Sequence, residues 1–280
     1  MKSGASVMVF TLNEEIHLES CLKSLEWCDD VIVIDSFSQD NTEKIAKQSG
    51  ARFFQHAFVG FGSQRQWAIQ NTSPKHEWIL ILDADERVSE ALAQEVATVT
   101  AISTPDVAAY RLRRRFHLWG RWLKYSSLYP VWVVRLIHKD RVVYFDRGHA
   151  ESQTVNGKTL SLENDLIDEN LKGIEEWFQR QKRYAEKEAI YEIEDELNGS
   201  GKISDIFSQD PMRRQAGMKR LIRQFPFRPH FYFIYSYFFR LGFLDGKEGF
   251  LFCRMKSAYH GMIVSKKREL KSKQTSRVSG

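Results

Sequence analysis

The sequence predicts an α/β protein whose first third forms a parallel sheet. In this third, short and continuous apolar runs alternate with helical stretches. Strands that are apolar on both faces belong to sheets that helices cover on both sides. Of the 280 residues, 42% are hydrophobic and 13% aromatic, which is enough for a buried core and excludes a wholly disordered chain or a coiled coil.

Four apolar runs are the expected strands of this sheet. Helical spacing of apolar side chains follows the first run, a turn-and-cap composition follows the second, and a weaker helical pattern follows the third. The expected strands are residues 6–10, 31–34, 52–55 and 78–82. The expected helices are residues 14–26, 42–49 and 63–70.

The rest of the chain predicts a second, helical part. Residues 107–150 have the composition of mixed strands and loops, and residues 166–197 that of a helix, ended by Asn-Gly-Ser-Gly. We therefore expect an α/β domain over residues 1–165, a helical, amphipathic and basic extension over 166–264, and a disordered basic tail over 265–280.

Polar side chains follow the strands of the expected sheet. Asp83 and Asp85 come directly after the fourth run, Asp35 ends the second, and Asn13 follows the first. Ligands of α/β sheets bind beyond the carboxyl ends of the strands, and two carboxylates there can hold Mg²⁺ or Mn²⁺ on a phosphate group. The alternative is a polar turn in which Asp85 caps the next helix.

Two common nucleotide sites are excluded at these strand ends. The loop after the first run lacks the Gly-rich dinucleotide fingerprint, and the chain lacks the Walker pattern. An ordinary NAD-dependent dehydrogenase or a P-loop enzyme is therefore not expected.

Three stretches in order carry a resemblance to a known family. They are SVMVFTLNEE, VIVIDSFSQDNT and WILILDADE. Together they resemble the inverting family-2 glycosyltransferases, which have the GT-A fold. Within that family the likeness is greatest to lipopolysaccharide core β-1,4-glucosyltransferases, and the stretch FPFRPHFYFIYSYFFRLGFLDGKEGF also matches their C-terminal portion. The resemblance implies a UDP-sugar donor and a divalent metal, Mg²⁺ or Mn²⁺.

The resemblance also implies roles for the residues of the first two stretches. Thr11, Asn13 and Glu15 lie where the family's first loop contacts the nucleotide. Asp35 matches the carboxylate that reads the uracil or the ribose. One position departs from the family, because Phe37 replaces a glycine and can reshape the base pocket.

The third stretch matches the family's paired carboxylates. In this resemblance Asp83 contacts the ribose and the metal, and Asp85 holds the metal on the diphosphate. Arg65 is a candidate contact of the donor diphosphate, with a surface position on its helix as the alternative.

A general base must take the proton of the acceptor hydroxyl. Related enzymes often carry adjacent His and Glu residues at this point, whereas Ala150 separates His149 from Glu151 here. We expect Glu151 as the base and His149 as a metal ligand or diphosphate contact, with Asp146 as the second candidate base. The alternative is that these residues only anchor a loop.

Charge is divided unevenly along the chain. The net charge is +5, but residues 205–280 carry 16 Lys/Arg against 5 Asp/Glu, and the first 204 residues carry 25 against 31. Arginines at 111 and 113–115, followed by tryptophans, add a second basic group. This group either grips a phosphorylated glycan acceptor or forms a solvated strand.

The basic C-terminal region is also rich in aromatic residues. Its longest stretch without a charge, residues 229–239, is eleven residues long, against roughly 20 needed to span a bilayer. Aromatic and basic residues together are typical of a segment that lies in the membrane interface. The alternatives are a buried helical hairpin or the interface of a homo-oligomer.

These expectations combine into one function. We expect a cytoplasmic enzyme, peripheral on the inner face of the cytoplasmic membrane, that transfers glucose from a UDP-sugar to a lipid-linked glycan such as a lipopolysaccharide core. Cys21, Cys28 and Cys253 cannot all pair and fit a reduced compartment. The alternatives are a polyprenyl-phosphate glycosyltransferase, a sugar-nucleotide binder without catalysis, and a nucleic-acid-binding protein. The last is disfavoured because no nucleic-acid module is present, so no nucleic acid is expected as a partner.

Overall fold

The computed structural model describes residues 4–102, 104–147, 150–197, 225 and 227–278. The chain divides into two compact units, Met1–Lys172 and Gly173–Gly280. The division lies seven residues after the expected boundary at residue 165, because residues 166–169 form a strand of the first unit's sheet. His149, a candidate site residue, lies outside the described residues.

The expected parallel strands are all present in the first unit. β1 (Ala5–Thr11) is central and lies parallel to β2 (Val31–Asp35) and to β4 (Trp78–Asp83). β3 (Arg52–Gln55) continues the sheet beside β2, also in parallel. The carboxyl ends of these four strands therefore meet at one edge, where the polar residues of the sequence motifs lie.

Strands of mixed direction extend the same sheet on the far side of β4: β8 is antiparallel to β4 and to β6, whereas β11 and β12 lie parallel to β6. The strand order is β3-β2-β1-β4-β8-β6-β12-β5, with β7 and β11 also paired to β6. The added strands are β5 (Glu86–Arg87), β6 (Val107–Leu118), β7 (Arg121–Trp122), β8 (Val131–His138), β11 (Lys158–Ser161) and β12 (Leu166–Glu169). β9 (Val142–Arg147) and β10 (Ala150–Val155) form a separate two-stranded sheet.

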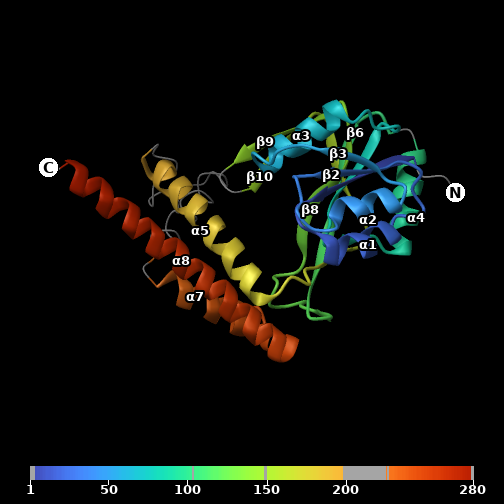
Figure 1. The fold of residues 1–280 in the computed structure, drawn as a ribbon. Helices are drawn as coiled ribbons and strands as arrows, with labels where there is room; N and C mark the ends of the chain where they lie inside the picture. The colour runs from blue at the N-terminus through green and yellow to red at the C-terminus, as the bar shows by residue number, and fades with distance from the viewer. Residues whose placement is uncertain (1–3, 103, 148–149, 198–224, 226, 279–280) are drawn as a thin grey trace. The chain divides into compact units, whose positions relative to one another are not determined.

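Helices cover both faces of the sheet (Figure 1). Side chains of a strand alternate between faces, so Val7 and Val9 pack in one core and Met8 in the other. The first core also takes residues of α1 (Glu15–Lys23), α2 (Thr42–Gln48) and α4 (Glu90–Ala101). The second core takes residues of α3 (Phe61–Asn71) and β9. The predicted α/β class, with its buried strands, is confirmed.

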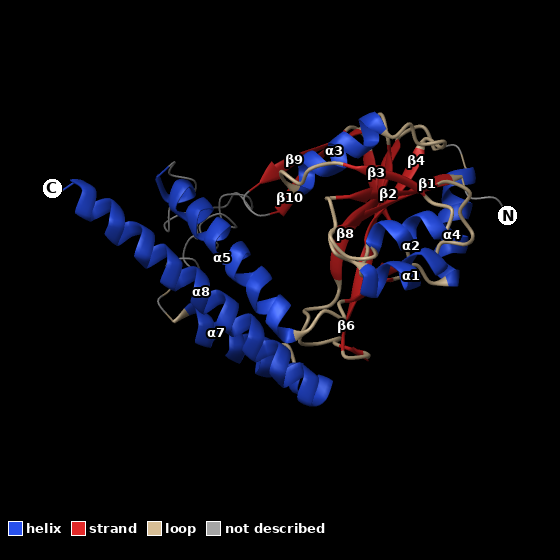
Figure 2. Cartoon of the chain, in the orientation of Figure 1, coloured by secondary structure: helices blue, strands red, loops and turns tan. Residues whose placement is uncertain are grey.

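The second unit is helical (Figure 2). Its elements are α5 (Ile174–Leu197), α7 (Arg228–Ile234), the π-helical turn η2 (Tyr235–Phe239), the 3-10 turn η3 (Gly242–Asp245) and α8 (Gly246–Val278). Ala185 and Ala189 of α5 pack against Tyr259 and Ile263 of α8. The expected helix over residues 166–197 is right from residue 174 on, but its first four residues belong to β12.

The tail expected to be disordered is helical as far as Val278. Ion pairs with α5 account for this difference, because they give the basic residues partners within the chain. Lys267 binds Glu192 at 3.1 Å and Glu196 at 2.6 Å, and Lys271 binds Glu196 at 2.7 Å. Within the part of the chain that is described, no helix has both the length and the apolar character to cross a membrane.

Candidate active site

Asp35 lies buried at the end of β2, directly beside Thr11 at the end of β1. The Thr11 hydroxyl donates to Asp35 Oδ1 at 2.9 Å. The Ser38 backbone N–H and the Gln55 side chain donate to Oδ2 at 2.9 and 3.2 Å. Because a buried carboxylate is costly unless it is hydrogen-bonded, these donors hold Asp35 as a fixed acceptor at the edge of the sheet.

Phe37, which departs from the family pattern, has the backbone conformation that favours glycine. Its φ is 64° and its side chain is half-exposed. A residue with a side chain pays about 1–2 kcal/mol in this left-handed region. The backbone of this chain at residue 37 therefore has a conformation that glycine adopts more readily than phenylalanine does.

The loops after β1 and β2 are joined by hydrogen bonds of Asn13 and Glu15, two residues that the sequence predicts to contact the nucleotide. Asn13 Oδ1 accepts from the Gln39 N–H, and the Asn13 N–H donates to the Ser38 hydroxyl, both at 2.7 Å. Glu15 Oε2 accepts from the backbone and the side chain of Asn41 at 3.0 and 2.7 Å. The side chains of Asn13 and Glu15 therefore stabilise the conformation of the two loops beside Asp35.

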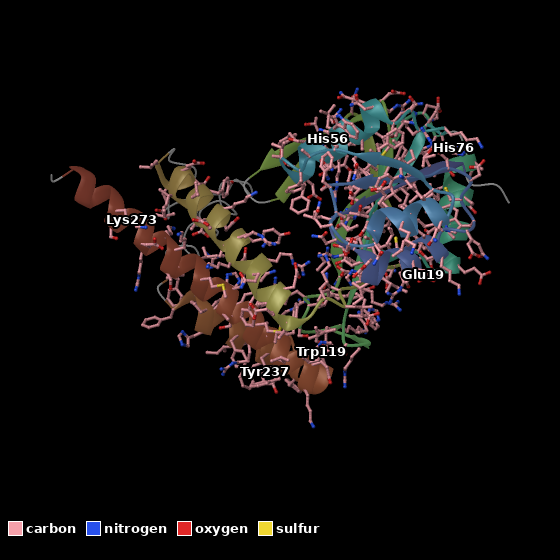
Figure 3. The ribbon with its side chains drawn as sticks, viewed as in Figure 1. Glu19, His56, His76, Trp119, Tyr237 and Lys273 are labelled. Carbon is pink, nitrogen blue, oxygen red and sulfur yellow. The ribbon has the colours of Figure 1, made fainter. Side chains whose placement is uncertain are left out.

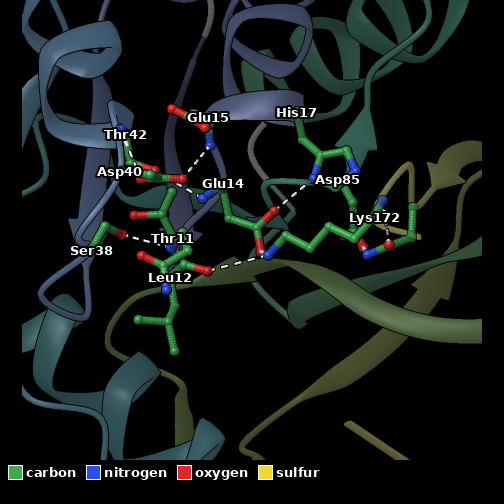
Figure 4. Close-up of polar contacts among 12 residues, drawn as sticks. Thr11, Leu12, Glu14, Glu15, His17, Ser38, Asp40, Thr42, Asp85 and Lys172 are labelled. Carbon is green, nitrogen blue, oxygen red and sulfur yellow. Dashed lines mark hydrogen bonds and ion pairs between the residues drawn. The ribbon is translucent and has the colours of Figure 1, made fainter. Parts of the chain in front are cut away.

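Asp85 is half-buried and is held by a residue far along the chain. Asn170 Nδ2 donates to Asp85 Oδ2 at 2.9 Å. The next residues reach the first loop, since Lys172 Nζ binds Glu14 Oε1 at 2.6 Å and the Leu12 carbonyl at 3.3 Å. Figure 4 shows these contacts running between Asp85 and the β1–α1 loop.

His17 of α1 holds the segment of residues 170–172 in place through a hydrogen bond to Leu171. Its buried ring accepts the Leu171 N–H at Nε2, 2.7 Å away, so Nδ1 carries the proton and donates to Glu14 Oε2 at 2.6 Å. We name residues 170–172 with Glu14 and His17 the "clamp". The clamp joins the carboxylate expected to hold the metal to the loop expected to hold the nucleotide.

Asp83 is placed between two buried arginines. Arg135 Nη2 donates to its Oδ2 at 2.7 Å, and Arg65 Nη2 lies 3.3 Å from its Oδ1. Burial opposes ionisation of Asp83, but Arg135 and Arg65 outweigh it and hold the pKa of this carboxyl well below its usual range. Asp83 is therefore a fixed anion, and its two oxygens are already paired with guanidinium groups.

Arg135 owes its position to an irregularity in β8. Tyr110 pairs with Leu136 and Arg111 with Val134, so Arg135 is the extra residue of a bulge. Bulges re-aim a side chain and are common beside active sites. Arg135 Nη2 also donates to Glu86 Oε1 at 2.6 Å. Burial raises the pKa of Glu86 to about 7, and the charge of Asp83 adds to the rise.

Three buried polar groups beside this cluster have no partner among the described residues. They are Nε and Nη1 of Arg135 and the hydroxyl of Tyr144. Both residues are 3% exposed. Unpaired buried donors are rare in native proteins, so these atoms mark a place where a polar or anionic ligand can be satisfied.

Glu151 and Asp146 have different surroundings, although they lie opposite each other in the β9–β10 register. Glu151 forms an ion pair with Arg65 through Oε1 and is partly exposed. Asp146 accepts from the Gly62 N–H at 2.8 Å and from Ser63, and so caps α3 across the fold. A Cβ on Gly62 would lie 2.2 Å from the Phe145 carbonyl carbon, which is why glycine is required at this approach.

The arginines of β6 are engaged within the chain. Arg113 and Arg115 bind the two oxygens of Asp165 at 2.7 and 2.8 Å, and Arg114 binds Asp168 at 3.1 Å. These contacts favour the structural alternative over a grip on acceptor phosphate. Arg111 is exposed, and its guanidinium lies 4.8 Å from the centre of the half-exposed Trp132 ring.

The structure adds residues that the sequence motifs did not single out. Glu86 follows Asp85 directly, so its nearness was the available signal. The sequence motifs gave no role for Arg135, because a bulge leaves no mark in an apolar strand pattern. Asn170 and Lys172 carry no local signal, since their partners lie 85 and 158 residues away.

Replacing Asn170 tests the clamp. Asn170→Ala removes the donor that orients Asp85, and losses of about 10–100-fold are typical when a residue that positions a metal ligand is removed. We expect a fall of that size in kcat/KM, which higher metal concentration partly restores. Asn164→Ala is the matched control, since Asn164 makes the same 2.9 Å bond to Glu95 away from the site. Equal losses in both variants would contradict the role of the clamp.

The expected metal site is partly within the described residues. Over those residues, no three acidic, histidine or cysteine side chains gather as a metal site, and His149 lies outside them. The residues present nevertheless fit a hard cation, because Asp85 is half-buried and offers carboxylate oxygen. Asp83 fits less well, since its oxygens already face Arg65 and Arg135.

Sequence comparisons give the chain its relatives. Residues 6–155 match the family described as Glycosyl transferase family 2. The chain is 32% identical over 124 residues to the lipopolysaccharide core biosynthesis glycosyltransferase LpsC of Rhizobium meliloti (strain 1021), covering 42% of this chain and 45% of LpsC. It is 34% identical over 110 residues to an uncharacterized glycosyltransferase of Rickettsia bellii (strain RML369-C), covering 39% and 37%. The chain thus spans less than half the length of these relatives.

A comparison of structures agrees on the fold. The mannosyltransferase PcManGT from Pyrobaculum calidifontis, solved with GDP-Man and Mn²⁺, superposes with a TM-score of 0.53. The superposition covers 95% of this chain and 87% of that one, at 14% sequence identity. At this identity the match speaks for the GT-A-like fold alone.

Proposed function

Since the chain belongs to glycosyl transferase family 2, we propose that it transfers a hexose, glucose by its resemblance, from a UDP-sugar to a lipid-linked glycan with inversion. The observation that carries this proposal is the meeting of Asp35, Asp83 and Asp85 at the carboxyl ends of β2 and β4. Asp35 is a fixed acceptor that suits the base or the ribose, and Asp83 is a fixed anion that suits the sugar. Asp85 is a half-buried carboxylate that suits a metal-bound diphosphate.

The donor diphosphate is placed beside Asp85 in this proposal. A divalent cation held there, Mg²⁺ or Mn²⁺, would stabilise the negative charge that develops on the leaving diphosphate. PcManGT, with the same fold, binds Mn²⁺, which supports this cofactor. Two buried nitrogens of Arg135, Nε and Nη1, have no partner among the described residues, and Arg65 binds both Asp83 and Glu151. Both arginines can therefore donate hydrogen bonds to the diphosphate.

The transfer itself needs a base on the acceptor side. We assign it to Glu151, because both oxygens of Asp146 are engaged at the start of α3. The acceptor oxygen bonds to the anomeric carbon while the bond from that carbon to the diphosphate breaks. Glu151 takes the hydroxyl proton, and UDP leaves with the bonding electrons. Attack opposite the leaving group inverts the anomeric configuration.

The acceptor is proposed to be a lipopolysaccharide core or a related glycolipid at the inner face of the cytoplasmic membrane. The name of LpsC, a relative over 42% of the chain, supports this class of acceptor. The exposed Arg111 and Trp132 offer a cation and a sugar-stacking ring on the first unit.

A donor screen tests the proposal. Purified protein is incubated with Mn²⁺ and UDP- or GDP-linked hexoses, with and without core glycolipid, and the released nucleotide is measured. We expect UDP release with a UDP-hexose that rises at least tenfold with the glycolipid, and a product of inverted configuration by NMR. Release only from GDP-sugars, or a product of retained configuration, would contradict it.

A further inference from the structure

We infer that the turn between α7 and α8 is a membrane anchor that inserts into the interface of an anionic bilayer. The surface concerned, here named the "aromatic turn", consists of Phe238, Phe239, Leu241, Phe243, Leu244 and Phe250. The inference goes beyond the proposed function, since binding to lipid is independent of which sugar is transferred.

The aromatic turn exposes large apolar side chains to solvent. Its six side chains are between 43% and 75% exposed, with Phe239 the most exposed. The four phenylalanines alone leave roughly 400 Å² open, at about 150–250 Å² for a whole aromatic side chain. The largest apolar patch of a monomeric protein is commonly about 300–600 Å² and is often a functional surface.

Three rings of the aromatic turn gather around one neighbouring ring. The Tyr237 ring lies 5.1, 6.2 and 5.5 Å from the rings of Phe238, Phe243 and Phe250. Leu241 reverses the chain with a φ of 60°. A Cβ on Gly242 would lie 2.6 Å from the Ser236 carbonyl oxygen, so glycine lets η2 and η3 close against each other. The exposed rings therefore stand on a rigid turn.

The charges around the aromatic turn fit an anionic surface. Lys247 and Arg254 are exposed on the first turns of α8. Asp245, an acid of the same segment, is 4% exposed, and Glu248 is half-buried. Residues 225–256 contain five Lys/Arg and two Asp/Glu. The exposed charge beside the apolar surface is therefore cationic, as in segments that lie on anionic lipid.

The basic end of α8 is unsuited to this role. Lys266, Lys267 and Lys271 are all bound to glutamates of α5. Figure 3 shows Tyr237 and Lys273 toward opposite ends of the helical unit; from residue 246 to 273, α8 rises about 40 Å at 1.5 Å per residue. The inferred lipid contact therefore lies in the aromatic part of the basic C-terminal region and not at its basic end.

A second copy of the chain fits the aromatic turn less well than lipid does. A stable dimer buries about 800 Å² on each partner, roughly twice the area that the four phenylalanines offer. In a symmetric dimer through this surface, Lys247 and Arg254 of the two copies would approach each other. An anionic bilayer can bury the exposed rings and at the same time attract Lys247 and Arg254.

Vesicle sedimentation of the full chain, without sugar donor, tests the inference. Phosphatidylcholine vesicles are compared with vesicles that also contain phosphatidylglycerol. We expect the double variant F239S/F243S to lower binding to both at least tenfold, at low and high salt. K247Q/R254Q should lower binding to the anionic vesicles alone by about 30-fold at low salt, since each basic residue is worth about 1 kcal/mol.

Matched controls separate this surface from general effects. Val59→Ser removes an apolar side chain that is 75% exposed in the first unit, and Lys273→Gln removes a charge from the far end of α8. Both should bind vesicles as the wild type does. Wild-type binding by F239S/F243S would overturn the inference. So would a wild type that binds no vesicles but is dimeric by light scattering and becomes monomeric in F239S/F243S.

Discussion

Asp85→Asn should abolish metal-dependent turnover while leaving the fold intact. The change removes the charge of the carboxylate that we propose to hold the cation on the leaving diphosphate. Losing one positioned interaction with charge that develops in the transition state costs about 10²–10³ in rate. We expect a loss of that size in UDP release, with UDP-sugar binding reduced when Mn²⁺ is present and unaffected in chelator.

The contrast with Asp83 sharpens this prediction. Asp85 bonds Asn170, and an asparagine keeps an oxygen that can accept from it, so the melting temperature of Asp85→Asn should match the wild type. Asp83→Asn should melt earlier, because it weakens the compensation of buried Arg65 and Arg135. The exposed Asp106→Asn is the neutral control. Full activity of Asp85→Asn, or of the wild type in chelator, would refute the role of Asp85.

Glu151→Gln should retain the donor but lose transfer. Removing a positioned general base costs about 10²–10⁴ in rate. Glutamine keeps a carbonyl oxygen for Arg65, so we expect an unchanged fold and UDP-sugar affinity. Rates of UDP release with glycolipid, together with calorimetric binding of the UDP-sugar, measure the two effects separately.

Asp146→Asn is the control for the base. It weakens the cap of α3, for which a cost of about 1 kcal/mol is usual, and it leaves Glu151 in place. We expect a lower melting temperature with transfer within a few-fold of the wild type. If Asp146→Asn proves inactive and Glu151→Gln active, the two residues must exchange roles.

The sequence was informative where local patterns decide the structure. The four parallel strands, the three following helices and the strand-end acids were predicted, because burial on both faces and turn chemistry are written in neighbouring residues. The short strand β12 was taken for helix, since four residues of mixed character carry no period of their own. The helical tail was taken for disorder, because its partners Glu192 and Glu196 lie on α5, far along the chain.

The residues of the candidate site also differ in whether local sequence reveals them. Asp35, Asp83 and Asp85 could be picked out as candidates from the sequence, because Asp35 and Asp83 end strands and Asp85 follows two residues after Asp83. The surroundings that distinguish Glu151 from Asp146 could not, since they depend on Arg65 and on the start of α3, more than 80 residues earlier. The clamp was hidden for the same reason.

The position of the clamp determines where this chain can be joined to another in a chimera. The family match ends at residue 155, yet Asp168, Glu169 and Asn170 bind Arg114, Arg87 and Asp85. A chimera joined at the end of the match would leave two half-buried arginines, Arg87 and Arg114, without their acids and Asp85 without its donor. A junction after Lys172 keeps all these partners on the catalytic side, so grafts that exchange the helical unit among relatives should be joined there.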